Sequence, residues 1–224
     1  MQIRPIARIN TDFDTKFGIP RQSGLIKELE ATIIFEPEFR SPEALRELDR
    51  FSHIWLIWGF SENAESKWSP TVRPPKLGGN KRVGVFATRS PFRPNELGLS
   101  CVELTGIEKS EKYGYILRVK GADLMNGTPI YDIKPYLPVT DRIDEAKGAL
   151  TDDIHTVNVN ICEELLNRLP KEKQITLIKV LEQDPRPAYK DEPDRIYGFS
   201  FAGYEVKFCG TKTEITVMDI QKQA

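Results

Sequence analysis

Short segments rich in β-branched and aromatic residues recur throughout the first 140 residues of this chain. Glycine, proline or polar residues bound each of them, as they bound the strands of antiparallel sheets. The segments are 5–9, 31–35, 53–58, 83–87, 99–104 and 115–119. Apolar residues at helical spacing do not extend over any long stretch of this region. The pattern therefore predicts a mainly β chain whose N-terminal part is an antiparallel sheet or β-barrel.

Residues 53–58 (HIWLIW) are the most apolar of these segments. A continuous apolar run of this length is typical of a strand that is covered on both faces. Just before it, Ser41, Pro42 and Glu43 have the order of an N-cap, a first-turn proline and an acidic first turn. A short helix is expected from there to near Phe51.

The pattern changes after residue 155. Helical spacing appears over 163–169 and 174–183, each followed by a proline, and alternation over 196–201, 205–208 and 214–220 predicts strands. These elements suit a small sheet with helices packed on it. Because residues 141–155 are polar and rich in acids, we expect a linker there. The predicted domains are a β-barrel over 1–140 and a small α+β domain over 156–224.

Composition excludes several classes of protein. The 224 residues include 39% hydrophobic and 29% charged residues, which is typical of a globular protein. No apolar run approaches the ~20 residues of a membrane span, and the N-terminus lacks an apolar signal, so a cytoplasmic location without a membrane partner is expected. Three cysteines without C-x-x-C spacing and only two histidines argue against a metal site. Dinucleotide-binding and P-loop glycine motifs are missing as well.

Residues 67–95 carry seven lysine and arginine side chains and no aspartate or glutamate. Cations gathered in this way repel one another, and an anionic partner such as a phosphate backbone would relieve the repulsion. Neutralisation by carboxylates from elsewhere in the fold is an equal alternative. Five prolines stiffen the segment, so its side chains have little entropy left to lose on binding. On these grounds alone, the segment is a rigid site for some anionic ligand or a neutralised structural loop.

Two further polar clusters follow. Asp123 stands at the entrance of a turn marked by Asn126 and Gly127. Asp132 and Lys134 share one face if their segment is a strand. An acid–base function and a plain surface ion pair are both open for this pair.

The chain resembles the TrmO (TsaA-like) family in several motifs. The residues that carry the resemblance are 73–79 (RPPKLGG), 84–95 (GVFATRSPFRPN) and 132–136 (DIKPY), supported by 20–22 (PRQ) and 184–189 (DPRPAY). These motifs are spread over nearly the whole chain. The resemblance implies a β-barrel methyltransferase that uses S-adenosylmethionine and works as a homodimer, with the cofactor near the subunit interface. The implied substrate is the anticodon stem-loop of threonine tRNAs, methylated at N6 of N6-threonylcarbamoyladenosine 37.

The same resemblance assigns residues to the site. The implied cofactor contacts are Pro20, Arg21, Gln22, Ser61, Glu62, Arg89, Leu99, Asp123, Leu124, Met125 and Asn126. At Ser61 and Glu62 the chain departs from the family, whose members often carry His-Gln there. Together with the basic segment, the resemblance indicates RNA or substrate contacts by Arg73, Lys76, Lys81, Arg82, Arg93, Asn95 and Tyr136.

Methyl transfer to a conjugated nitrogen benefits from a group that accepts its proton. Asp132 is the candidate base, and Lys134 or Arg93 is expected to bind the carboxylate of the substrate. Two other functions remain open. One is a tRNA-binding protein without catalytic activity, and the other is an S-adenosylmethionine-dependent enzyme that acts on a small molecule.

Overall fold

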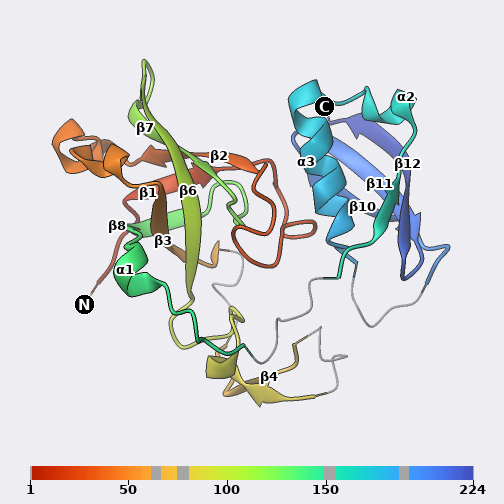
Figure 1. Cartoon of the computed structure of the whole chain (residues 1–224), viewed down its shortest axis with the longest axis horizontal. Helices are drawn as coiled ribbons and strands as arrows, with labels where there is room; N and C mark the ends of the chain where they lie inside the picture. The colour runs from red at the N-terminus through yellow and green to blue at the C-terminus, as the bar shows by residue number, and fades with distance from the viewer. Residues whose placement is uncertain (1, 62–66, 75–80, 149–154, 187–191, 224) are drawn as a thin grey trace.

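The computed structural model describes residues 2–61, 67–74, 81–148, 155–186 and 192–223, and it contains two β-rich units (Figure 1). Within these ranges, no helix combines the length and the apolar character needed to cross a membrane. The prediction of a mainly β chain is confirmed. The division at residues 140 and 156 stays a prediction.

The first unit is a closed barrel of six antiparallel strands in the order β1-β2-β7-β6-β3-β8. Pairing of Ala7 with Ile130 joins β8 back to β1 and closes the ring. The strands are β1 (Ala7–Asn10), β2 (Glu30–Phe35), β3 (His53–Gly59), β6 (Leu97–Ser110), β7 (Gly114–Lys120) and β8 (Pro129–Pro135). Alternate side chains fill the interior, because successive residues of a strand point to opposite faces.

Strand β3 shows this alternation directly. Ile54 and Leu56 are fully buried inside the closed sheet, whereas Trp55 and Ile57 are half-buried on its outer face and His53 is exposed. The prediction that both faces of this strand are covered is therefore wrong. Its outer side chains are apolar although only the inner face is packed in the core.

The helix expected after Ser41 does begin at Pro42, but it is a short 3-10 helix and is not continuous to Phe51. Two short 3-10 turns occupy that stretch, η2 (Pro42–Leu45) and η3 (Leu48–Arg50), after a first one, η1 (Pro37–Phe39). Glu47 separates η2 from η3 with φ 67°, a left-handed conformation that ends any continuous helix.

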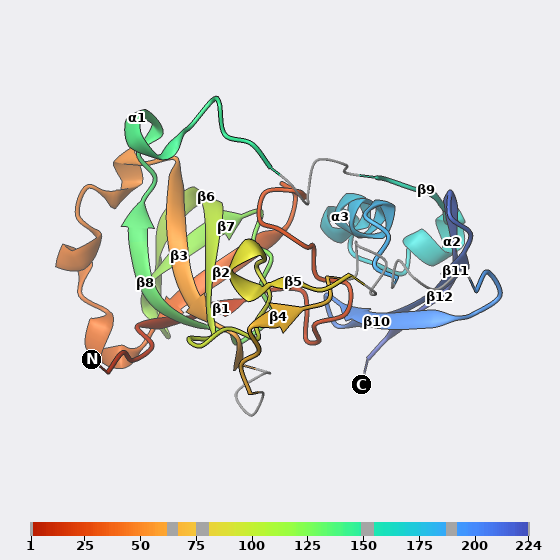
Figure 2. The same ribbon diagram turned by 90° about the horizontal axis from the view of Figure 1, so that it is seen from below.

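A small hairpin projects between β3 and β6 (Figure 2). It consists of β4 (Thr71–Val72) and β5 (Val83–Gly84), and the 3-10 turn η6 (Val85–Ala87) follows it directly. The predicted strand over 83–87 therefore ends at Gly84. The Thr88 hydroxyl and amide both donate to the Val85 carbonyl and close this turn, which satisfies backbone groups that a strand would leave to a neighbour.

The second unit packs helices against a four-stranded sheet in the order β10-β11-β12-β9. Its elements are β9 (Asn158–Asn160), α2 (Glu163–Leu166), α3 (Lys171–Glu182), β10 (Tyr197–Phe201), β11 (Tyr204–Gly210) and β12 (Glu214–Lys222). Strand β9 was not predicted, and it pairs parallel with β12. One further helix, α1 (Pro138–Asp141), lies after the closed sheet.

The segment between β1 and β2 ties the two units together. Its residues Phe13, Ile26 and Leu29 are buried in the core of the second unit rather than in the closed sheet. Lys173 of α3 forms an ion pair with Asp12, with a 2.7 Å Nζ–Oδ2 distance and little exposure of either side chain. Gly18 has φ 95° and lies against the Phe199 ring, where a Cβ atom would stand 2.4 Å from the ring. These contacts fix the position of the loop around residues 16–22.

Candidate active site

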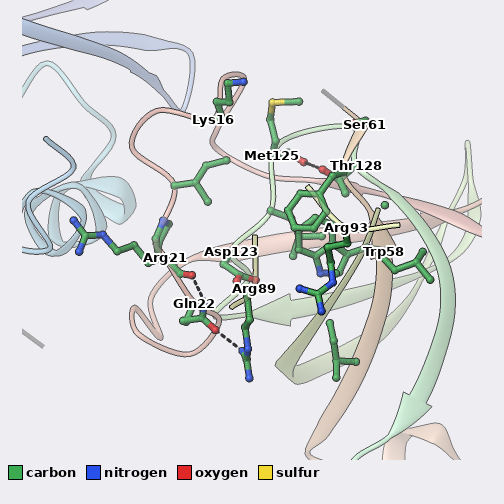
Figure 3. A pocket seen from close by; sticks show the side chains of 18 of the residues that line it. Lys16, Arg21, Gln22, Trp58, Ser61, Arg89, Arg93, Asp123, Met125 and Thr128 are labelled. Carbon is green, nitrogen blue, oxygen red and sulfur yellow. Dashed lines mark hydrogen bonds between the residues drawn. The ribbon is translucent and has the colours of Figure 1, made fainter. Parts of the chain in front are cut away.

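A pocket of about 420 Å³ opens where β3 and β6 meet the loop around residues 16–22 and the turn after β7. This volume lies within the usual range of small-molecule sites. Figure 3 shows Gln22, Arg89 and Asp123 gathered at its centre, with Trp58 and Arg93 nearby. The described residues that line it are Lys16, Ile19, Pro20, Arg21, Gln22, Trp58, Gly59, Phe60, Ser61, Thr88, Arg89, Arg93, Leu97, Gly98, Leu99, Asp123, Leu124, Met125 and Thr128.

Most of the predicted cofactor contacts meet in this pocket. Lining residues among them are Pro20, Arg21, Gln22, Ser61, Arg89, Leu99, Asp123, Leu124 and Met125. Glu62 lies outside the described residues. Asn126 is not a lining residue, since its side-chain nitrogen donates to Asp14 at 2.9 Å and its oxygen accepts from the Thr11 amide at 3.3 Å. Asn126 therefore braces the wall of the pocket from behind.

A chain of hydrogen bonds holds Asp123. The Trp58 indole donates to the Ser100 hydroxyl at 2.9 Å, and that hydroxyl donates to Asp123 Oδ1 at 2.6 Å. Burial raises the pKa of Asp123 above its ordinary value, although the Ser100 hydrogen bond and the charge of Arg89 act in the opposite direction. Arg89 itself donates to Gln22 Oε1. Among the described lining residues Asp123 is the one acid, and four lysine or arginine side chains line the same pocket.

Apolar side chains form one wall, and sequence reasoning missed most of them. The Trp58 and Phe60 rings meet edge to face with centroids 4.4 Å apart. Gly98 pairs with Trp58 across the β3–β6 ladder, and a Cβ atom there would lie 2.3 Å from the indole ring. A glycine inside a strand pattern, such as Leu97-Gly98-Leu99, is a recognisable signal of close approach.

The structure does not bring Asp132 and Lys134 into the pocket. They form an ion pair of 2.9 Å on the outer face of β8, with 46% and 62% of their side chains exposed. Ile57 pairs with Asp132 on one side and with Leu99 on the other. Asp132 therefore lies two strand spacings, about 10 Å, from the Leu99 position at the rim of the pocket. Tyr136 is also on this side, with its ring 5.8 Å from the ring of Trp55.

The residues predicted to contact RNA lie partly in the pocket and partly outside it. Arg93 lines the pocket, where its Nη1 donates to the Thr88 carbonyl at 2.7 Å. Arg73, Lys81, Arg82 and Asn95 are exposed around the β4–β5 hairpin, while Lys76 lies outside the described residues. Among residues that the structure describes, no lysine or arginine of 67–95 forms an ion pair. Within the described residues these cations therefore lack direct ion pairs, although the charge of Arg89 acts on the buried Asp123 carboxylate.

Family models match nearly all of the chain. The model of the tRNA-methyltransferase O N-terminal domain matches residues 8–142, and that of the TrmO C-terminal domain matches residues 155–223. The chain belongs to the TrmO family. The resemblance drawn from the motifs is therefore confirmed.

Other members of the TrmO family show how extensive the similarity is. A tRNA (adenine(37)-N6)-methyltransferase of Escherichia coli (strain K12) is 36% identical over 98% of this chain and 97% of its own length. A Pseudomonas aeruginosa relative named a putative S-adenosylmethionine-dependent methyltransferase is 38% identical over 97% of this chain and 96% of its own. A TrmO crystal structure superposes with TM-score 0.80 at 32% identity, covering 99% of both chains. The fold of the TrmO family thus extends over the whole chain.

Proposed function

We propose that the substrate of this S-adenosylmethionine-dependent tRNA adenine-N6 methyltransferase is N6-threonylcarbamoyladenosine 37 in threonine tRNAs. The enzyme acts in the cytoplasm on the anticodon stem-loop. The observation that carries the proposal is the convergence of Pro20–Gln22, Arg89, Leu99 and Asp123–Met125 in one pocket. These segments are far apart in the sequence, and the hairpin that carries the exposed cations leads through η6 to Thr88 and Arg89 of the pocket.

The groups in the pocket fit S-adenosylmethionine. Its amino-acid end has a carboxylate and an ammonium, its sulfur is cationic, and its adenine is flat and largely apolar. Arg89 suits the carboxylate, because arginine pairs with carboxylates through charge-assisted hydrogen bonds. Asp123 suits the cationic groups, and the wall of Trp58, Leu97 and Leu99 suits the adenine. A G-x-G-x-x-G loop is not needed for this arrangement.

When bound, S-adenosylmethionine supplies a methyl group on a sulfur that leaves uncharged. The task of the protein is then to align the attacking N6 with that methyl group, so positioning dominates. Arg93 is better placed than Lys134 to bind the carboxylate of the threonylcarbamoyl group, because Arg93 lines the pocket whereas Lys134 is paired with Asp132 outside it.

A homodimer would explain how Asp132 takes part. Apolar side chains on or near the outer face of β3 and β6 are left exposed, namely Leu99 (51%), Leu137 (44%), Val139 (94%) and Ile143 (67%). Leu99 belongs both to this face and to the pocket rim. A twofold contact here sets the outer face of one protomer, with its Asp132, against the rim of its partner's pocket. Asp132 then serves as the proton acceptor for the neighbouring site.

Replacing Asp132 by Asn is expected to leave S-adenosylmethionine affinity within about twofold of wild type and to lower turnover by roughly 100-fold, as expected for loss of a general base. Calorimetry and single-turnover methylation measure the two quantities. Mixing Asp132→Asn with Arg89→Ala tests the shared site, because half of the dimers then carry one complete site, and roughly a quarter of wild-type activity should return. Full activity of Asp132→Asn alone would remove the residue from catalysis.

The raised pKa of Asp123 has a consequence for cofactor binding. Only the ionised carboxylate attracts the cationic groups of the cofactor, so affinity should decline as pH falls through the pKa of Asp123. This decline should begin above the ordinary aspartate pKa of 3.8, because burial raises the pKa of Asp123. Asp123→Asn should bind more weakly at neutral pH and show a flatter profile in calorimetry at a series of pH values. Equal slopes for the two proteins would contradict this role.

The substrate is tested with two synthetic anticodon stem-loops that differ only at position 37, one with adenosine and one with N6-threonylcarbamoyladenosine. Methyl transfer from labelled S-adenosylmethionine to the modified loop alone is expected. Transfer to neither loop, with retained RNA binding, would favour a tRNA-binding protein without catalytic activity. Methyl transfer to small molecules alone would favour the other alternative, an S-adenosylmethionine-dependent enzyme that acts on a small molecule. Stem-loops of threonine and other tRNAs compared side by side test the threonine preference.

A further inference from the structure

Three large aromatic side chains within residues 67–95 are exposed. Trp68 is 54% exposed, Phe86 74% and Phe92 42%. All three lie within residues 67–95, the segment without an acidic residue. Apolar rings gathered on a surface, with charged groups around them, are typical of a binding site for another molecule. We call these three residues and Arg93 the aromatic rim.

Backbone contacts hold the aromatic rim together. The Ser69 amide donates to the Phe92 carbonyl at 3.2 Å, and the Val85 amide donates to the Pro70 carbonyl at 3.0 Å. These bonds join the neighbour of Trp68 to Phe92, and the neighbour of Phe86 to Pro70. The rings therefore project from a fixed backbone, which lowers the entropy lost when a partner binds.

Arg93 connects the aromatic rim to the pocket. Its guanidinium carbon lies 5.9 Å from the centroid of the Phe86 ring, and the same side chain lines the pocket. Thr88 and Arg89, the next residues after η6, line the pocket as well. Phe86 is not a lining residue, and Arg93 connects its ring to the pocket from outside.

Charge indicates what kind of partner binds there. The cations around the rings lack ion pairs within the described residues, and a second copy of the same surface would repel it. RNA can bind both the exposed rings and the cations around them, because unpaired bases stack on aromatic rings while phosphates attract lysine and arginine. A protein partner with an acidic surface would satisfy the charge, but it would have no need for flat rings next to a nucleoside pocket.

We propose that Phe86, backed by Arg93, stacks on an unpaired base that neighbours the target adenosine. Arg73, Lys81 and Arg82 contact the phosphates around it. This inference rests on the proposed function, since it assigns a partner to the same site. An adenosine has to leave the base stack of its loop to enter a pocket, and a ring that holds the adjacent base compensates for part of that unstacking.

The test measures binding of a fluorescently labelled anticodon stem-loop by anisotropy over a range of salt concentrations. Phe86→Ala should weaken binding roughly tenfold at every salt concentration, because stacking does not depend on counterion release. Phe86→Trp should bind like wild type. Arg82→Gln should instead reduce the slope of log affinity against log salt by about one. Ile175→Ala, which removes exposed apolar surface on α3 of the second unit, should have no effect.

S-adenosylmethionine affinity measured by calorimetry, unchanged in Phe86→Ala, would show that this variant retains its fold. Wild-type affinity of Phe86→Ala for RNA would overturn the stacking proposal, as would a salt slope altered as in Arg82→Gln. A dimer that dissociates on this substitution, seen by sedimentation, would place Phe86 at a subunit interface and overturn it too. If wild type binds the RNA but methylates nothing, the proposed function fails while the stacking result still stands.

Discussion

Arg89→Ala is expected to weaken S-adenosylmethionine binding by about 30-fold, the effect of losing one charge-assisted hydrogen bond worth about 2 kcal/mol. Arg89 lies at the centre of the pocket, where it donates a hydrogen bond to Gln22. Its positive charge opposes the rise in the pKa of Asp123. It is the cation best placed to meet the carboxylate of the cofactor. The loss should be seen directly in calorimetric titrations with S-adenosylmethionine.

A matched control is Arg82→Ala. It removes the same charge from the same segment, but Arg82 lies outside the pocket and contacts Thr71. S-adenosylmethionine should bind this variant as it binds wild type. Equal losses in both variants would mean that general charge, and not a contact in the pocket, attracts the cofactor. Unchanged affinity in Arg89→Ala would remove this residue from the site.

Gly98→Ala should damage the pocket without removing any polar group. The new Cβ atom would lie 2.3 Å from the Trp58 ring, so the indole would have to move. Its hydrogen bond to Ser100 would break, and Ser100 holds Asp123. Overpacking of this kind costs about 1–3 kcal/mol of stability. We expect a lower unfolding midpoint in urea together with at least a roughly tenfold loss of S-adenosylmethionine affinity.

Gly106→Ala is the control that separates an effect on the pocket from a general effect of alanine in β6. Gly106 lies on β6 as well, and a Cβ atom at this position would meet no heavy atom within 4 Å. Its cofactor affinity should equal that of wild type. Wild-type affinity in Gly98→Ala would show that the position of Trp58 does not matter for binding.

Residue patterns in the sequence predicted much of the pocket, because the motifs that carry the resemblance supply its polar residues. Pro20 and Gln22 lie far along the chain from Arg89 and from Asp123, and the structure brings them together. The apolar wall was less accessible. Trp58 reads as one more residue of an apolar strand, and only its pairing with Gly98 across the ladder makes it part of the site.

Asp132 shows the limit of strand periodicity. The two-residue period predicted that Asp132 and Lys134 share a face, and their 2.9 Å ion pair agrees. The position of that face relative to the pocket depends on the register between β3 and β8. This register shifts between Ile57 and Trp58. Local sequence does not encode such a shift, so the distance of Asp132 from the pocket could not be predicted.

The packing of the segment between β1 and β2 could not be predicted from local sequence either. It reads as a polar loop of the first unit, yet Phe13 and Leu29 belong to the core of the second. This packing depends on contacts with residues more than a hundred positions away. The loop that carries Pro20 and Gln22 is consequently braced by both units, which connects the second unit to the geometry of the pocket.

The most direct test of the account is a crystal structure of the protein with S-adenosylhomocysteine, the product of the cofactor. Electron density for the ligand is expected in the pocket, with its carboxylate at Arg89 and its adenine against Trp58 and Leu99. A second cavity of about 580 Å³, lined by residues such as Thr32, Arg118 and Lys173, provides the contrast. Electron density for the ligand in that second cavity would contradict the account. So would a pocket without ligand density at a saturating ligand concentration.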